Sequence, residues 1–340
     1  MILPLSGRIR PKGRLGFIVQ SLLRMVSLLL AVTLITFTLI SYSPFDPVTA
    51  YVGADATVSE AQKENIAEHW GFNDPGPVRY LKWMGNLLQG EMGTSVIFHK
   101  PVSEVLAERF SASMMLMGTA WVLSGVLGFT LGVVSGFYRQ RWPDRLINAI
   151  ALALASAPIF WLALLALMIF SVSLQWFPMG MAVPAGKLAS EVTWGDRLYH
   201  LVLPALVLSV GGIANITLHT REKMISALNS DYMLFAWARG ESRWRSVMRH
   251  GLRNIALPAI TLQFASFSEL FGGSILAEQV FSYPGLGSAA TLAGLKGDIP
   301  LLLGVTLFSA LFVFTGNLLA NVIYGLVDPR ISQGRRDVTH

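Results

Sequence analysis

The residues that could do chemistry in this sequence are few, and none has the spacing of a catalytic or metal-binding motif. There are no cysteines, which excludes disulfides and thiolate metal sites. The six histidines show no ligand spacing, and the motifs G-x-x-x-x-G-K-[ST], H-E-x-x-H and G-x-S-x-G are absent. We therefore expect no enzymatic activity, no metal and no cofactor in this chain.

One acid, Glu269, is notable for its position, because it is the only acid that we place inside a predicted membrane span. Charged side chains are costly in lipid and usually face a bundle interior or an aqueous path. One hypothesis is that Glu269, Gly272 and Gly273 line an aqueous path, in which the Glu269 carboxylate would attract a cation. The alternative is that Glu269 makes a polar contact between helices, beside glycines that allow close helix approach.

The composition indicates that most of the chain lies in a membrane. Of its 340 residues, 53% are hydrophobic and only 14% are charged, whereas a soluble domain has roughly 25% charged residues. A span needs about 20 predominantly apolar residues. We predict an all-α integral membrane protein whose transmembrane domain covers residues 17–326. Its six spans are expected near residues 17–42, 112–137, 147–174, 200–220, 257–280 and 301–326.

The distribution of Lys and Arg predicts the orientation, because cytoplasmic loops are enriched in these residues. Eighteen of the 26 basic residues fall on one side, against six of the 20 acids. That side comprises residues 1–24, which include a basic N-terminal extension (1–16), together with the turn at 138–145, a loop at 221–256 and the tail (327–340). Both termini are therefore expected in the cytoplasm. Orientation alone explains most of this charge, and nothing else favours nucleic-acid binding.

The predicted external loop 43–110 is acidic and contains several aromatic residues. A structureless loop of this length would be unusual in a compact domain, so we expect local structure in it. It could cap the membrane interface or bind a soluble partner.

Small residues and prolines mark how the predicted spans pack. Ser124, Gly128, Gly132 and Gly136 recur every fourth residue and form a smooth ridge that allows another helix to approach closely. Pro158 lies inside the predicted third span, where a proline removes a backbone donor and bends the helix.

The cytoplasmic loop is predicted to contain a short helix. Asp231 is expected to cap its start, residues 232–239 give about two turns, and Gly240 supplies the left-handed residue that ends helices. Tyr232, Phe235 and Trp237 would be exposed there, which requires a partner surface or the lipid interface. The physical argument alone leaves both alternatives open.

The same loop resembles a known family. The strings D-Y-M-L-F-A-W-A-R-G (231–240) and R-H-G-L-R-N-I-A-L-P (249–258) are similar to the cytoplasmic "EAA" loop of ABC importer permeases, in the first-permease branch of the dipeptide, oligopeptide and nickel importers. Further matching strings, in the family's order over nearly the whole chain, occupy residues 70–75, 80–95, 156–163, 200–205, 272–287 and 326–331.

The resemblance implies the fold of a type I ABC importer permease and a role as half of an import pathway in the bacterial cytoplasmic membrane. Expected partners are a second homologous permease, one or two ATPase subunits, an extracytoplasmic substrate-binding protein and membrane lipid. ATP and Mg²⁺ would be used by the ATPase subunits. The short helix would be the coupling helix that contacts the ATPase. Its implied coupling residues are Asp231, Tyr232, Phe235, Ala236, Trp237, Ala238, Arg239 and Gly240.

The resemblance leaves the substrate open among dipeptides, oligopeptides, glutathione, nickel and metal chelates. The strings around Glu269 are more similar to the nickel-type members, which implies that Glu269, Gly272 and Gly273 line the translocation pathway and that Glu269 favours a cationic or metal-bearing substrate. Leu234, Phe235 and Trp237 are less polar than the branch usually is at these positions, which indicates a more apolar coupling surface. Among other functional classes, a stand-alone secondary transporter or channel is the main alternative, and a membrane-embedded enzyme is the next.

Overall fold

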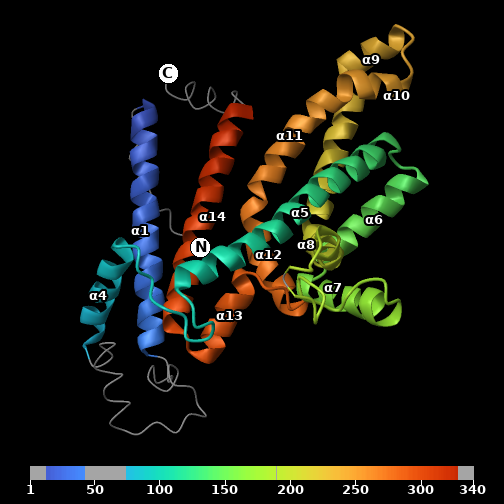
Figure 1. Ribbon diagram of the computed structural model, residues 1–340. Coiled ribbons are helices and arrows are strands. Elements are labelled where there is room, and N and C mark those ends of the chain that lie inside the picture. Colours follow the sequence, from blue (N-terminus) through green and yellow to red (C-terminus); the bar gives the residue numbers. More distant parts are fainter. Residues whose placement is uncertain (1–12, 43–73, 189, 328–340) are drawn as a thin grey trace. The chain divides into compact units, whose positions relative to one another are not determined.

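The computed structural model describes residues 13–42, 74–188 and 190–327, which form helices joined by loops with no β-strand among them (Figure 1). The chain divides into two compact units, residues 1–103 with 293–318 and residues 104–292 with 319–340. The first twelve residues of the predicted N-terminal extension and the tail from residue 328 lie outside the described residues.

The first unit contains α1 (Gly13–Ser41), α4 (Gly76–Leu88) and most of α14 (Ile299–Val327). The helices of the second unit begin with α5 (Val102–Phe137), α6 (Trp142–Ser156), α7 (Ile159–Ala166), the π-helical η1 (Leu167–Ser173) and α8 (Trp194–Leu228). They continue with α9 (Asp231–Ala238), α10 (Arg243–Ser246), the π-helical η2 (Val247–Gly251), α11 (Leu252–Ala265), α12 (Phe267–Val280) and most of α13 (Leu286–Lys296).

The helices agree with the predicted all-α membrane fold. Four of them are long and apolar enough to cross a membrane, namely parts or all of α1, α5, α8 and α14. Two bent helix pairs also qualify by composition, which gives up to six spans if each pair is one span.

Two of the predicted spans are not single helices. The stretch predicted at 147–174 turns by 110° between α6 and α7, because Ala157 precedes a proline and adopts an extended backbone, and Pro158 then begins a new helix. The stretch predicted at 257–280 bends by 51° between α11 and α12. At this bend the carbonyl oxygen of Gln263 accepts hydrogen bonds from the side chains of Ser266 and Trp121, each at 3.0 Å, and such side-chain insertions bend helices.

In the first unit, α4 forms part of the loop predicted at 43–110, whose residues 43–73 lie outside the described part of the chain. The Tyr80 hydroxyl lies 2.9 Å from Thr33 Oγ1 of α1, and its ring meets Phe37 edge-on at 5.4 Å. The buried Asp298 accepts hydrogen bonds from Ser95 Oγ (2.6 Å) and from the backbone N–H of Leu301 (3.1 Å). Local structure in this loop therefore rests on contacts distant in sequence.

The second unit is built around α8, which packs against α6, α7, α11 and α12. Thr193 caps its start, with Asp196 completing a capping box. The helix continues through Pro204 and ends at Leu228, so it includes the first residues of the loop predicted at 221–256.

The predicted small-residue ridge of α5 lies against α8. A Cβ added to Gly128 would lie 2.8 Å from Ile216 Cβ, and one added to Gly132 would lie 2.5 Å from Thr220 Cβ. At Gly136 the corresponding neighbour is Met224 Cβ, at 2.6 Å. These spacings leave no room for any side chain, so the glycines set the distance between the two helices.

A buried ion pair joins the α5–α6 turn to α8. Asp144 accepts two hydrogen bonds from Arg221, at 2.7 and 3.0 Å, and two more from Ser135 Oγ (2.6 Å) and the Gln140 N–H (2.7 Å). Its side chain is only 3% exposed. Arg221 is one of the basic residues that predict the orientation, and this ion pair gives it a packing contact as well.

Candidate functional site: the α9 coupling surface and the α12 face

The short helix predicted in the cytoplasmic loop is α9, and its start differs from the prediction. Asp231 is the first residue of the helix, while Ser230 occupies the N-cap position without a side-chain capping bond. The hydroxyl of Ser230 instead donates to the Ala227 carbonyl. The prediction that Asp231 caps the helix is therefore wrong, although a carboxylate in the first turn still interacts favourably with the helix dipole.

The end of α9 is the predicted one. Gly240 has φ +85°, a backbone conformation that only glycine adopts without strain. The Gly240 N–H donates to the Trp237 carbonyl (2.9 Å) and the Glu241 N–H donates to the Ala236 carbonyl (3.2 Å). This is the Schellman pattern, in which the chain folds back over the last helical turn.

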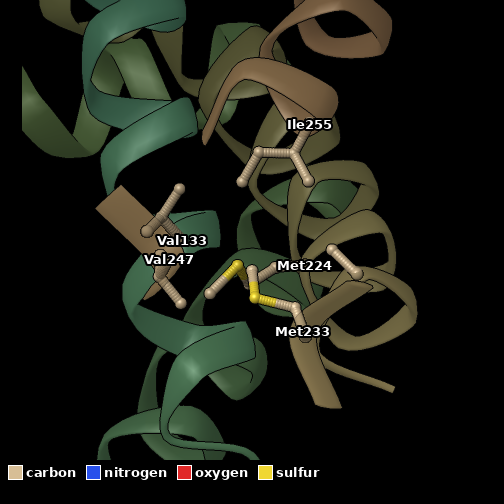
Figure 2. Close-up of a cluster of buried hydrophobic side chains, with 6 residues drawn as sticks. Val133, Met224, Met233, Val247 and Ile255 are labelled. Atoms are coloured by element: carbon tan, nitrogen blue, oxygen red, sulfur yellow. The ribbon is translucent and has the colours of Figure 1, made fainter. Parts of the chain in front are cut away.

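The inner face of α9 is part of a buried apolar cluster. Met233 is fully buried there and packs with Val133 of α5, Met224 of α8, Val247 of η2 and Ile255 of α11 (Figure 2). Ala227 completes the buried set. Four elements of the second unit therefore meet α9 at one point.

Trp237 also contacts this cluster, which corrects the prediction that it is exposed. Its ring is partly buried against the cluster, and the Arg243 guanidinium lies 5.2 Å from its centroid. Ala236 is buried as well. Residues 233, 236 and 237 are three and four apart and so share one helix face. Trp237 therefore faces away from a partner that binds the opposite face of α9.

The outer face of α9 is exposed and largely apolar. Tyr232, Leu234 and Phe235 are 40%, 53% and 67% exposed, and Asp231, Ala238, Arg239 and Gly240 are exposed beside them. Neighbouring large apolar side chains that the described chain leaves uncovered require a partner surface or the lipid interface. A force applied to this face would reach α5, α8 and α11 through the cluster, because packed interiors are nearly incompressible.

The three residues predicted to line the pathway separate in the structure. Glu269 and Gly272 are exposed on α12, with no atom within 4 Å of the position of a Gly272 Cβ. Gly273 faces inward, where an added Cβ would lie 3.1 Å from Leu208 and 3.3 Å from Ile159. Gly273 therefore packs α12 against α8 and α7, and only Glu269 and Gly272 remain candidates for a pathway.

An exposed stripe continues along α12 from Glu269. Gly272, Leu276 and Gln279 follow at intervals of three or four residues and are exposed in the chain by itself. A carboxylate and an amide on one face are poorly matched to lipid hydrocarbon. This face is therefore suited to a polar pathway or a subunit interface.

Sequence reasoning missed Glu278, a second acid within the span predicted at 257–280, so the prediction that Glu269 is the only acid inside a span is wrong. Glu278 is fully buried. Its carboxylate accepts hydrogen bonds from Ser113 Oγ (2.6 Å) and the Ser288 N–H (3.1 Å), and a Cβ at Gly285 would overlap it. Ser113 Oγ in turn accepts from the Leu286 N–H at 2.8 Å. The signal in the sequence was the motif at 272–287, where this acid is followed by closely spaced glycines.

No group of three or more His, Cys, Asp or Glu side chains in the described part of the chain is arranged to hold a metal ion.

Comparison with known proteins agrees with this interpretation. Residues 128–333 match the family model described as binding-protein-dependent transport system inner membrane component, and residues 14–117 match the model of the N-terminal region of such membrane components. The chain is 36% identical to the oligopeptide transport system permease protein AppB of Bacillus subtilis, with 93% of this chain and 99% of the relative covered.

Two further relatives are similar over the same extent. A putative peptide permease protein of Brucella ovis is 36% identical, and the glutathione transport system permease protein GsiC of Salmonella paratyphi A is 33% identical, each with 93% of this chain and 99% of the relative covered. With its helical fold and its match over most of the length, the chain belongs to the binding-protein-dependent transport system inner membrane component family, the multi-pass permease subunits of ABC importers.

Proposed function

We propose that the chain forms half of a peptide import pathway, paired with a second homologous permease, and that α9 transmits the movement of an ATPase subunit to the membrane helices. The observation that supports this most strongly is the division of α9 into two faces. One face is exposed and apolar around Phe235, and the other is packed through Met233 onto α5, α8, η2 and α11.

The coupling role is tested by Phe235→Asp, which places a charge in the centre of the exposed face. Loss of ATPase co-purification and of ATP-dependent uptake is expected, while the protein still inserts into the membrane. Leu88→Asp on α4 is the matched control, because Leu88 is 83% exposed and lies on the predicted external side. If Phe235→Asp retains the ATPase as well as Leu88→Asp does, α9 is not the coupling helix.

The end of α9 offers a second test. Gly240→Pro replaces φ +85° with a fixed negative φ and removes the backbone N–H that donates a hydrogen bond to the Trp237 carbonyl. Association of the chain with the ATPase should therefore be lost. Gly186, in a loop before α8, has the same φ of +85°. Gly186→Pro should therefore impose a similar backbone strain without affecting association with the ATPase. Equal loss of ATPase association in the two variants would show a general folding defect instead.

A peptide is the substrate that we favour, because the relatives above are named for oligopeptides, peptides and glutathione. The exposed carboxylate of Glu269 would interact favourably with the ammonium group of a peptide. A nickel ion or a metal chelate is the second candidate, since the same carboxylate would also attract a cation. The two candidate substrates are distinguished by measuring whether unlabelled peptide or Ni²⁺ competes with the uptake of a labelled tripeptide.

The pathway role of Glu269 is tested by Glu269→Gln, which keeps the shape and removes the charge. Uptake of a tripeptide should fall, and uptake of an N-acetylated tripeptide, which lacks the ammonium group, should fall less. Glu91→Gln in an exposed loop is the control. If Glu269→Gln leaves uptake of every candidate substrate unchanged, Glu269 does not line the pathway.

A further inference from the structure

Helix α6 is held to the rest of the second unit by few buried side chains. In α6, which the structure describes in full, only Asp144 and Ala151 are buried. They are seven residues apart and therefore share one face of the helix, the face that packs on α8. Ala151 contributes little more than a methyl group, so the position of α6 depends mainly on the contacts of Asp144.

The carboxylate of Asp144 is bound by three different elements of the fold. Arg221 of α8 donates from Nε to Oδ1 (2.7 Å) and from Nη2 to Oδ2 (3.0 Å). Ser135 of α5 donates to Oδ1, and the backbone N–H of Gln140 in the α5–α6 turn donates to Oδ2. Four donors at two oxygens match an ionised carboxylate, which is an acceptor only. Asp144 therefore joins α5, the turn, α6 and α8 at one point.

The two-bond contact with Arg221 fixes more than a distance. A planar guanidinium meets a carboxylate through two parallel bonds in one relative orientation, so the contact also fixes how far α8 is rotated and shifted along α6. Among the described residues, these are the only side-chain hydrogen bonds that join α6 to α8. Buried ion pairs contribute little net stability compared with apolar packing, and their best-attested use is to specify register.

The ion pair lies one helical turn from the residues of α8 that support α9. Met224 follows Arg221 by three residues and belongs to the buried cluster that contains Met233 of α9. Helix α5 approaches α8 at the same level, since a Cβ at Gly136 would lie 2.9 Å from the Arg221 carbonyl oxygen and 2.6 Å from Met224 Cβ. A displacement of α9 would therefore reach α8 at the turn where Asp144 binds it.

We propose that Asp144 and Arg221 are a positioning pair for transport, which makes α6 and the α5–α6 turn follow α8 when α9 moves. This inference rests on the proposed coupling function of α9. With the pair intact, the movement of one helix becomes the movement of the group of helices. Without it, α8 shifts relative to α6, and ATP is hydrolysed with less transport.

The test measures labelled tripeptide uptake per ATP hydrolysed, in proteoliposomes that contain the chain with its co-purifying permease, ATPase and binding protein. Asp144→Asn keeps the shape and removes the charge, whereas Arg221→Lys keeps the charge and removes the two-bond geometry. Both variants should retain the ATPase and lower uptake per ATP about fivefold. Failure of lysine to replace arginine is the result that distinguishes fixed register from simple charge neutralisation.

The matched control is Asp196→Asn at the opposite end of the same helix. Asp196 is also ion-paired, with Lys187 at 2.9 Å, but it lies in the first turn of α8, far along the helix from α9. Its replacement should change uptake per ATP less than twofold. An equal decrease in Asp196→Asn and Asp144→Asn would show that any loss of an ion pair on α8 has this effect, and would overturn the proposal.

A distance measurement with the pair intact gives a second test that does not depend on the folding of these variants. The chain has no cysteine, so nitroxide labels can be attached at Leu146→Cys on α6 and Lys223→Cys on α8, both exposed, in complexes with cysteine-free partner subunits. The distance between the labels, from pulsed electron paramagnetic resonance, should be the same in the nucleotide-free and the ATP-and-vanadate-trapped complex. A distance that changes on trapping would show that α6 does not follow α8.

Phe235→Asp separates this proposal from the coupling role on which it rests. If Phe235→Asp loses the ATPase while Asp144→Asn and Arg221→Lys keep the wild-type uptake per ATP, the positioning role is wrong and the coupling role of α9 stands. If Phe235→Asp retains the ATPase, the coupling role itself fails. If neither pair variant assembles, the label distance in the intact chain decides the question.

Discussion

At the residue scale, the two acids of α12 have opposite surroundings although they are nine positions apart. Glu269 is exposed, whereas Glu278 is fully buried with hydrogen bonds from Ser113 and Ser288. The difference follows from their neighbours, because the turn through Gly285 wraps around Glu278 and leaves no room for a side chain at that glycine. Burial and paired donors indicate a structural role for Glu278 and a surface role for Glu269.

This contrast predicts different effects of the same substitution. Glu278→Gln places an amide N–H₂ against a hydroxyl or N–H donor and should lower the free energy of unfolding by about 1–3 kcal/mol. The measurement is thermal unfolding of the purified chain in detergent. Glu269→Gln should leave unfolding unchanged and affect transport instead. Equal stability of the two variants would contradict the structural role of Glu278.

At the element scale, the contact between α5 and α8 depends on glycine. An added Cβ at Gly132 would lie 2.7 Å from the Thr217 carbonyl oxygen and 2.5 Å from Thr220 Cβ. The Thr217 oxygen belongs to the α8 backbone and the Thr220 Cβ is bonded to it, so neither atom can move away unless the whole helix moves. The same two helices also support the inner face of α9 through Val133 and Met224.

Gly132→Leu should therefore force α5 and α8 apart and cost about 1–3 kcal/mol or more, the range for overpacking. Gly118→Leu on the same helix is the control, because no atom lies within 4 Å of a Cβ at Gly118. Comparing the two unfolding temperatures, together with ATPase co-purification, checks the prediction. Equal unfolding temperatures for the two variants would show that the α5–α8 spacing is not set at Gly132.

At the scale of the whole molecule, the basic residues predict that both termini lie in the cytoplasm, on the same side as α9. The chain has no cysteine, so single introduced cysteines can be labelled without background. Ser6→Cys and Ser332→Cys should react with a membrane-impermeant maleimide only after permeabilisation, and Gln89→Cys in an exposed loop should react in intact cells. Labelling of either terminus in intact cells would reverse the proposed orientation.

The sequence by itself determined the membrane class, the positions of four of the six predicted spans and the short helix that ends at Gly240. These features depend on local quantities, namely hydropathy over about 20 residues, helix-ending glycine and the distribution of Lys and Arg. The motifs at 231–240 and 249–258 added the family, which the comparisons confirm.

Only the tertiary structure decided which side of each helix is covered. Trp237 and Phe235 are two residues apart with similar hydrophobicity, yet one packs on the buried cluster and the other is exposed. Likewise Gly272 and Gly273 are adjacent, and only Gly273 contacts other helices. Burial depends on which helices meet in space, and those meetings join residues far apart in sequence, as Ser113 and Glu278 do.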